Sequence, residues 1–243
     1  MRYHLVWICL AGLMLGGVVI GMTASPVRAD HGADTWRQAA ESVVVINPTW
    51  PGYQRPGFGA PPGTAPAGSG VFLAVDGASE TSFILTSAHV VNRATNIDVV
   101  NFNGVKTTAS LVATDPARDL ALLRVALDGR AIRLARTTPH IGSHSCALGN
   151  SFGIGIGISC GVVSAVNRNN IKINQIEDFV QTDAAVNPGS SGGALVDARG
   201  HMIGLINAIF TKEADIDAGV NFAISVRLIE DWLDILRKSG KIG

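Results

Sequence analysis

The chain has 243 residues, of which 47% are hydrophobic and 16% are charged, and its formal net charge is zero. This composition is typical of a globular chain that can bury a core, and it excludes a disordered protein. Without an excess of basic residues, nucleic-acid binding is not expected. The 28 glycines and 10 prolines favour short strands joined by tight turns, so we expect an all-β fold.

Residues 1–29 are predicted to direct export. Residues 5–22 form an uncharged apolar run, and Val27 and Ala29 lie at the spacing that a signal peptidase reads. The run is either a cleaved signal peptide, which is the simpler interpretation, or a membrane anchor, since its length is at the lower edge of what spans a bilayer. Both alternatives place residues 30–243 outside the cytoplasm, in the periplasm or the extracellular space.

The exported part is predicted to contain two groups of short strands after a short helical segment at 34–41. The first group is expected at 42–46, 70–75, 82–91, 96–102, 108–115 and 120–125, and the second at 144–150, 158–166, 179–183, 193–198, 201–209 and 219–225. Each segment is rich in β-branched residues and is bounded by Gly, Asn, Asp or Pro. Two groups of about six strands predict two antiparallel barrels or sandwiches in tandem, over about 34–130 and 140–225.

Two segments depart from this strand pattern. Residues 47–68 carry most of the prolines and are expected to form a long surface loop or flap. Residues 226–238 have the apolar spacing of an amphipathic helix, with Ser225 as its N-cap, and we expect this helix to pack on the second barrel. Its apolar face is formed by Ile229, Trp232, Leu233 and Leu236.

Cys146 and Cys160 fall on two predicted strands that flank a glycine-rich connection. A cross-strand disulfide between them is feasible in an oxidising compartment. Two buried free thiols are the alternative, because a sequence does not give the geometry that a disulfide requires. Cys9 lies in the apolar run and is given no role.

The segment NPGSSGGALV, at 187–196, raises the question of whether one of its serines is a nucleophile. Such chemistry needs a base within reach of the hydroxyl and a carboxylate that orients the base. The chain offers His89 in LTSAHVV and Asp119 in DPARDLALL, and Ser191 follows them. The same glycines fit the GxSxG elbow of α/β-hydrolases, but in that fold the histidine follows the serine and a βαβ pattern surrounds it. Here His201 is the only later histidine, in a predicted hairpin.

Five motifs in this order resemble the protease domain of the HtrA/Deg family of trypsin-like serine proteases. They are TSAHVV, DPARDLALLRV, ALGNSFGIGIGISCGVVSAV, FVQTDAAVNPGSSGGAL and GVNFAIS, and the similarity runs from about residue 34 to 238. The resemblance implies a trypsin-like fold of two six-stranded antiparallel barrels followed by a C-terminal helix. It also implies that Ser191 is the nucleophile, His89 the general base and Asp119 the residue that orients it.

Further roles follow from the same resemblance. The amides of Gly189 and Ser191 would form the oxyanion hole, where a glycine lets the backbone point its N–H inward. The primary specificity pocket would be formed by Ala185, Ile206, Asn207 and Ala208. None of these is charged, so we expect cleavage after small or medium aliphatic residues.

Ser190 stands where the family usually has asparagine and where digestive trypsin-like enzymes have an aspartate that pairs with a newly cut N-terminus. A serine cannot form that ion pair. We therefore expect control by ordering of loops around the site, through a partner or a substrate, and not by cleavage of a zymogen.

The sequence thus predicts an exported serine endopeptidase that acts on polypeptides in protein quality control or regulated proteolysis. A protease-like binding scaffold without turnover is the alternative. We expect no metal, because His140 and His144 lie around a probable turn, and no cofactor, because GIGIGIS at 153–159 lacks the βαβ context of a dinucleotide loop. Family members often form homotrimers and carry PDZ domains; this sequence ends at Gly243 directly after the predicted helix, so no PDZ domain is expected.

Overall fold

A computed structural model describes residues 31–51, 67–75, 82–209 and 219–242 of the chain. The apolar run at 5–22 and most of the predicted loop at 47–68 lie outside these residues. Within the described ranges, no helix is long and apolar enough to cross a membrane.

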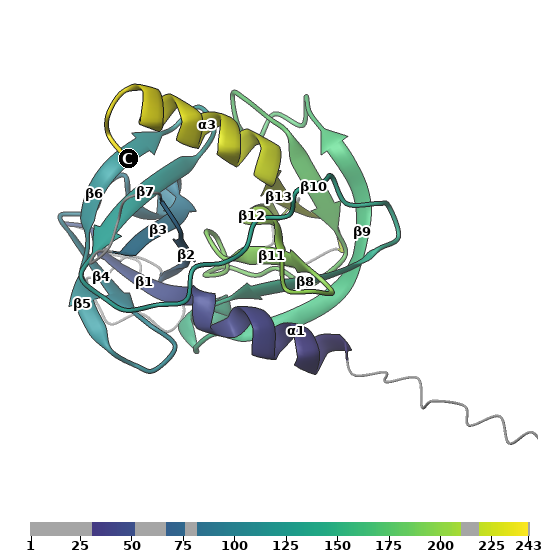
Figure 1. Cartoon of the computed structure of the whole chain (residues 1–243), viewed down its shortest axis with the longest axis horizontal. Helices are drawn as coiled ribbons and strands as arrows, with labels where there is room; N and C mark the ends of the chain where they lie inside the picture. Colours follow the sequence, from purple (N-terminus) through teal and green to yellow (C-terminus); the bar gives the residue numbers. More distant parts are fainter. Residues whose placement is uncertain (1–30, 52–66, 76–81, 210–218, 243) are drawn as a thin grey trace, which may run out of the picture.

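The first half of the fold is a seven-stranded antiparallel sheet with the order β5-β4-β1-β2-β3-β7-β6 (Figure 1). Its strands are β1 (Val43–Thr49), β2 (Gly68–Leu73), β3 (Ser82–Ser87), β4 (Asn96–Val100), β5 (Lys106–Thr108), β6 (Ser110–Asp115) and β7 (Leu120–Val125). Six strands were predicted here, and the seventh is β5, which lies just before the strand expected at 108–115. The expectation of a continuous strand over 82–91 is also wrong, because β3 ends at Ser87 and the short helix α2 (Ala88–Val91) follows it.

The second half is a closed six-stranded barrel with the order β10-β13-β12-β11-β8-β9. Its strands are β8 (His144–Gly149), β9 (Gly157–Arg168), β10 (Phe179–Thr182), β11 (Ala194–Asp197), β12 (Met202–Ile209) and β13 (Asn221–Ser225). All six predicted strands are present with bounds shifted by a few residues. The all-β, trypsin-like fold class is therefore confirmed.

Helices cover opposite sides of the two strand units (Figure 1). Helix α1 (His31–Ala39) and the 3-10 turn η1 (Ala40–Ser42) precede β1, and a second 3-10 turn, η2 (Ser151–Gly153), follows β8. Helix α3 (Val226–Lys238) has the predicted bounds, and the Ser225 hydroxyl caps it by accepting a hydrogen bond from Leu228 N. It packs against β12 and β13, as expected.

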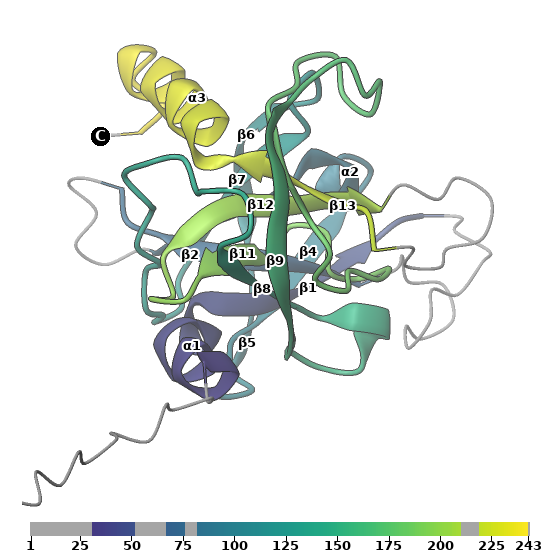
Figure 2. The same ribbon diagram turned by 90° about the vertical axis from the view of Figure 1, so that its right-hand side faces the viewer.

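One core joins the two halves. A cluster of buried side chains includes Leu85 and Leu120 from the sheet, Leu148 and Leu205 from the barrel, and Trp232 from α3. Burying each of these large apolar side chains contributes about 1.5–3 kcal/mol. This shared core fixes the halves relative to each other, so side chains from both can meet in one cleft. The linker between β7 and β8 crosses one face, and α2 lies towards the opposite face (Figure 2).

Candidate active site

The pairing of β3 with β7 brings His89 and Asp119 together. Ser87 is opposite Leu120 in this register, and Ala88 N donates to Asp119 O at 3.1 Å. Asp119 has a φ of +57°, a left-handed conformation that Asp tolerates better than most residues. Backbone pairing directly before His89 and directly after Asp119 thus fixes two residues that are 30 positions apart in the sequence.

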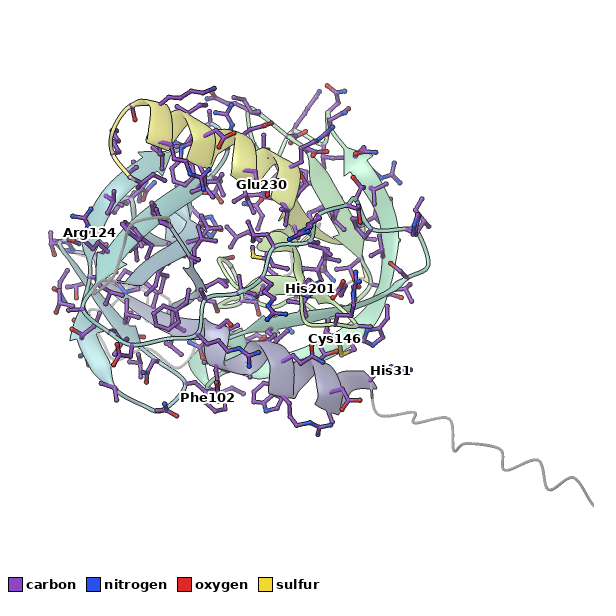
Figure 3. All side chains as sticks on the ribbon, in the orientation of Figure 1. His31, Phe102, Arg124, Cys146, His201 and Glu230 are labelled. Carbon is purple, nitrogen blue, oxygen red and sulfur yellow. A yellow bond between two sulfur atoms is a disulfide. The ribbon has the colours of Figure 1, made fainter. Side chains whose placement is uncertain are left out.

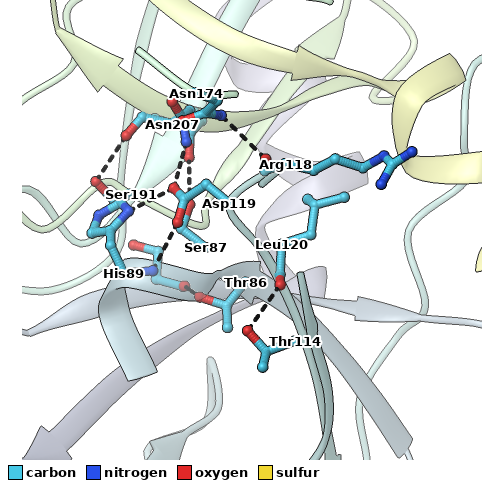
Figure 4. Close-up of polar contacts among 12 residues, drawn as sticks. Thr86, Ser87, His89, Thr114, Arg118, Asp119, Leu120, Asn174, Ser191 and Asn207 are labelled. Carbon is cyan, nitrogen blue, oxygen red and sulfur yellow. Dashed lines mark hydrogen bonds and ion pairs between the residues drawn. The ribbon is translucent and has the colours of Figure 1, made fainter. Parts of the chain in front are cut away.

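The Asp119 carboxylate is surrounded by three donors and is buried, at 8% exposure (Figure 4). The ring nitrogen Nδ1 of His89 lies 2.6 Å from Oδ2, and His89 N donates to Oδ1 at 2.8 Å. The third donor is Asn207 Nδ2, at 2.6 Å from Oδ2. An ionised carboxylate only accepts hydrogen bonds, so this pair places the proton of a neutral imidazole on Nδ1 and leaves Nε2 as an acceptor.

The turn that carries Ser191 has conformations that only glycine adopts easily. Gly189 has a φ of +98°, and a Cβ there would lie 2.2 Å from Asn150 O. Gly192 has a φ of +83°, and a Cβ there would lie 2.2 Å from Ser69 O. The glycines on both sides of the serine pair are therefore required by backbone conformation and by close packing.

Every backbone carbonyl from residue 188 to residue 191 is held by a donor. Phe152 N donates to Pro188 O at 2.6 Å, Ser69 Oγ to Gly189 O at 2.7 Å, Gly193 N to Ser190 O at 2.9 Å, and Ser69 N to Ser191 O at 2.9 Å. The turn is fixed peptide by peptide, although it has no regular secondary structure.

The backbone amides of the same turn alternate between bonded and free. Ser190 N donates to Asn187 O at 3.0 Å, and Gly192 N donates to Ile206 O at 2.8 Å. The amides of Gly189 and Ser191 donate to no partner among the described residues. Because N–H and C=O point in opposite directions across a trans peptide, the anchored carbonyls of residues 188 and 190 also fix the directions of these two free amides.

The Ser191 hydroxyl lies in a cleft between the two halves. It donates to Asn207 O at 3.3 Å, a long hydrogen bond that Figure 4 shows beside the His89 ring. The cleft has a volume of about 620 Å³. It is lined by Ala88, His89, Asn92, Pro116, Asp119, Ile173, Asn174, Gln175, Val186, Asn187, Pro188, Ser191 and Asn207.

The four residues predicted to form the specificity pocket lie in different surroundings. The side chain of Ile206 is 1% exposed and belongs to the interior cluster of the barrel. Asn207 lines the cleft, but its amide is engaged with Asp119. Ala185 N donates to Ser159 Oγ at 3.0 Å, while its neighbour Val186 lines the cleft. The side chain of Ala208 lies outside the described set. The pocket assignment stays a prediction.

Ser190 is buried at 3% exposure, and its hydroxyl shares a 2.7 Å hydrogen bond with Ser151 Oγ. Both groups are neutral. The position before Ser191 is therefore held by a pair of hydroxyls.

Residues 173–175 line a second wall of the cleft that no sequence motif predicts, and they belong to a loop over residues 171–177. The Glu177 carboxylate accepts hydrogen bonds from the amides of Ile171 at 2.7 Å, Ile173 at 2.7 Å and Asn174 at 3.0 Å. Burial alone would raise the pKa of Glu177, but these amides and that of Lys172 outweigh it and lower the pKa below its usual value.

The same loop reaches the first half of the molecule. Ile176 N donates to Ala117 O at 2.9 Å, and Asn174 Nδ2 donates to Arg118 O at 3.1 Å. These contacts support the turn that precedes Asp119. A glutamate six residues after an isoleucine matches no known motif, so these contacts could be found only in the folded structure.

Cys146 and Cys160 are directly opposite each other on β8 and β9, and the structure joins them in a disulfide. The bond lies beside the start of α1, where Figure 3 shows Cys146 close to His31. His31 packs on His144 there, with ring centroids 5.7 Å apart. His144 lies next to both sulfur atoms, but bonded sulfurs are not thiolate ligands. The disulfide is on β8 and β9 and shares no residue with the cleft.

Comparisons with known proteins agree with this architecture. A family model described as a trypsin-like peptidase domain matches residues 68–205. The periplasmic serine endoprotease DegP of Escherichia coli (strain K12) is 35% identical over 178 residues, which cover 72% of this chain and 36% of DegP. The serine endoprotease DegS of Haemophilus influenzae is 34% identical over 180 residues, covering 72% of this chain and 51% of DegS.

A solved structure of the HtrA-type protease AlgW with a tripeptide superposes with a TM-score of 0.74 at 36% identity, covering 86% of this chain and 64% of AlgW. The chain thus spans between 36% and 64% of the lengths of these three relatives. Two β units that bring a histidine, an aspartate and a serine from a glycine-rich turn into one cleft are typical of the trypsin-like peptidases as a class. The chain belongs to this family, within its HtrA/Deg branch, and the resemblance found in the sequence is confirmed.

Proposed function

We propose that the chain is an exported serine endopeptidase that hydrolyses peptide bonds with Ser191 as nucleophile, His89 as base and Asp119 as the group that orients the base. The observation that carries this proposal is the pair of amides at Gly189 and Ser191 that donate to no described residue, in a turn whose carbonyls from residue 188 to residue 191 are all hydrogen-bonded. Two unpaired donors next to a serine hydroxyl are what a developing oxyanion requires.

In the proposed reaction, Ser191 Oγ attacks the carbonyl carbon of the scissile bond and its proton moves to His89 Nε2. The carbonyl oxygen becomes an oxyanion that accepts hydrogen bonds from the two free amides. Asp119 stabilises the imidazolium, which then protonates the leaving amine. Water, deprotonated by the same imidazole, hydrolyses the acyl-enzyme and regenerates the serine.

One adjustment must precede the attack. In the structure the Ser191 hydroxyl donates to Asn207 O, so it has to turn towards His89 before it can transfer its proton. Apo active sites often have such loose geometry, which tightens when substrate binds. Substrate in the cleft would exclude water from this hydroxyl and favour its rotation towards His89.

The substrates we propose are polypeptides, cleaved after small or medium aliphatic residues. His89 and Asp119 are the only ionisable residues among those that line the cleft in the described ranges, so no fixed charge remains to select Lys, Arg, Asp or Glu. Val186 and Pro188 supply apolar surface instead. A peptide library with every residue before the scissile bond would test this, and a strong preference for Lys or Arg would contradict it.

We also propose that the protein works in the periplasm or outside the cell, in protein quality control or regulated proteolysis. The names of the DegP relatives state a periplasmic location, and the Cys146–Cys160 disulfide suits an oxidising compartment. Residues 5–22 would serve either as a cleaved signal or as an anchor. A homotrimer is the assembly that we propose by analogy with the HtrA/Deg family.

The test of the activity is incubation of the full chain with unfolded casein and a fluorophosphonate probe, beside a Ser191→Ala variant. We expect cleavage and labelling in the unmodified chain and neither in the variant. The bond from Ser191 Oγ to Asn207 O motivates one alternative, a binding scaffold whose serine is never activated. A folded chain that neither cleaves casein nor reacts with the probe would support that alternative.

A further inference from the structure

Ser69 lies on β2, in the first half of the molecule, yet its hydrogen bonds run to the second half. The residue is completely buried, at 0% exposure. Its hydroxyl donates to Gly189 O at 2.7 Å and accepts from Asn150 N at 2.8 Å. Its backbone amide donates to Ser191 O at 2.9 Å. One small side chain therefore links β2 to the turn of the nucleophile and to the segment that follows β8.

The position of Ser69 is itself fixed. Thr86 Oγ1, on the neighbouring strand β3, donates to Ser69 O at 2.7 Å, and Gly192 packs so closely on this carbonyl that it has no room for a side chain. The hydroxyl is thus held on a rigid strand. It meets a turn at Gly189 where glycine gives the backbone its widest conformational freedom.

We propose that Ser69 is a positioning residue for catalysis, because its hydroxyl holds the Gly189 peptide in the orientation that leaves the two oxyanion amides free. This proposal rests on the proposed peptidase function. If Gly189 O lost its donor, the peptide between Gly189 and Ser190 could rotate to find another partner. That rotation would move the Gly189 amide on one side and the Ser191 amide on the other, and it would leave the binding surface of the cleft in place.

The buried environment strengthens this role. Removing the hydroxyl would leave both Gly189 O and Asn150 N without their partner, and a buried polar group without a partner is strongly unfavourable. Asn150 is 1% exposed, so its amide has little access to water. The least costly response is a rearrangement of the glycine turn, because the strands on either side are fixed by pairing.

The test compares Ser69→Ala with Ser145→Ala in the full chain. Ser145 is a matched control: it is also 0% exposed, and its hydroxyl bonds to Thr182 Oγ1 at 2.8 Å within the second barrel, away from the turn. With a peptide substrate we expect Ser69→Ala to lower kcat by about tenfold to a hundredfold, less than the full loss of an oxyanion donor, with KM changed by no more than about twofold. Ser145→Ala should keep both constants.

A second readout does not depend on activity. Hydrogen–deuterium exchange of peptides covering residues 187–193 should become at least about tenfold faster in Ser69→Ala and stay unchanged in Ser145→Ala. Unchanged exchange in Ser69→Ala, or a rise in KM at constant kcat, would overturn the proposal. If the unmodified chain does not cleave peptides but exchange responds as expected, the Ser69 contact is upheld and the proposed peptidase function is the part that fails.

Discussion

The two halves of the molecule position their parts of the site by different means. In the first half, His89 and Asp119 sit at the ends of paired strands, and three donors surround the carboxylate. In the second half, Ser191 sits in an irregular turn that is held by hydrogen bonds at each carbonyl, two of them from Ser69 of the first half. His89 is thus held at the end of a paired strand, while the position of Ser191 depends on contacts between halves.

This difference indicates where the site can adjust. Strand pairing between β3 and β7 is cooperative and extends over six residue pairs, so the His89–Asp119 geometry should resist local changes. The serine turn has positive φ at two glycines and a hydroxyl that points to Asn207 O, so small shifts there change the alignment. Substitutions at Asp119 and its donors should therefore act through chemistry, and those that touch the serine turn through conformation.

The largest effect is expected from Asp119→Asn. Asparagine tolerates the φ of +57° at this position, so the backbone should be kept while the charge is lost. An amide cannot accept from all three donors, and in Ser-His-Asp triads this change lowers kcat by about 10⁴-fold through the wrong imidazole tautomer. Steady-state kinetics on a peptide substrate would measure the loss.

Asp98→Asn is the control for Asp119→Asn. Asp98 likewise has three donors, all of them side chains, and the hydrogen bond from Lys106 is the main cause that lowers its pKa. It lies on β4, away from the cleft, so kcat should be unchanged. Equal losses in the two variants would mean that carboxylate removal acts through the fold and not through His89.

Gly189→Ala tests the second half by conformation alone. The added Cβ would lie 2.2 Å from Asn150 O at a φ of +98°, so the turn must move and take the amide with it. We expect kcat to fall by about 10²-fold to 10³-fold, as for the loss of one oxyanion donor. Gly104→Ala adds the same methyl at a φ of +79° with open space around it and should retain activity. Full activity of Gly189→Ala would exclude this amide from the oxyanion hole.

The sequence was sufficient to predict twelve of the thirteen strands that the structure describes, and three residues that the structure brings into the cleft. Alternating apolar residues and glycine punctuation located twelve strand segments, because burial on one face of a sheet imposes that pattern. His89, Asp119 and Ser191 were predicted because nucleophilic serine chemistry needs a base and a carboxylate beside the hydroxyl. The break after Ser87 was missed, since the apolar residues of α2 continue the strand pattern without a helix signal.

The supporting residues could not be predicted, for a physical reason. Ser69 bonds to Gly189, 120 positions away, and Asn207 to Asp119, 88 positions away. Glu177 accepts from amides that lie three to six positions before it. A polar side chain alone does not indicate such partners. Asn207 was expected on the wall of the specificity pocket. Its backbone carbonyl does lie beside Ser191, but its side chain donates to Asp119. Side-chain direction on an irregular β strand depends on bulges, and β12 has one between Ile206 and Ala208.

Asn207→Ala tests a contact that joins the two halves. Its loss removes one of the three donors from Asp119 while the His89 contacts remain, so we expect kcat to fall by about tenfold and unfolding to become easier by about 1–3 kcal/mol. Asn92→Ala is the control, because Asn92 lines the same cleft but is exposed. Kinetics and chemical unfolding would be measured on both. If Asn207→Ala lost stability but kept kcat, the donor would matter for folding alone.

The smallest effect is expected from Glu177→Gln, which weakens the loop at the cleft wall without touching the serine turn. Glutamine accepts the amides of Ile171, Ile173 and Asn174 less strongly than a carboxylate, and Ile173 and Asn174 line the cleft, so KM should rise about twofold to threefold with kcat unchanged. Glu230→Gln removes the same charge from the exposed face of α3 and should change neither constant.

The pH dependence of stability tests whether the charge of Glu177 stabilises the fold. Because folding lowers the pKa of Glu177, its contribution is fully present above the ordinary value of about 4.5 and is lost as the pH falls through the lowered value. The unfolding free energy of Glu177→Gln should therefore be about 1–2 kcal/mol below that of the unmodified chain at pH 7, and the two should converge as the pH falls below the lowered pKa. A difference that stays constant between these pH values would show that the loss comes from packing of the loop, and that the charge of Glu177 does not hold it against the Asp119 turn.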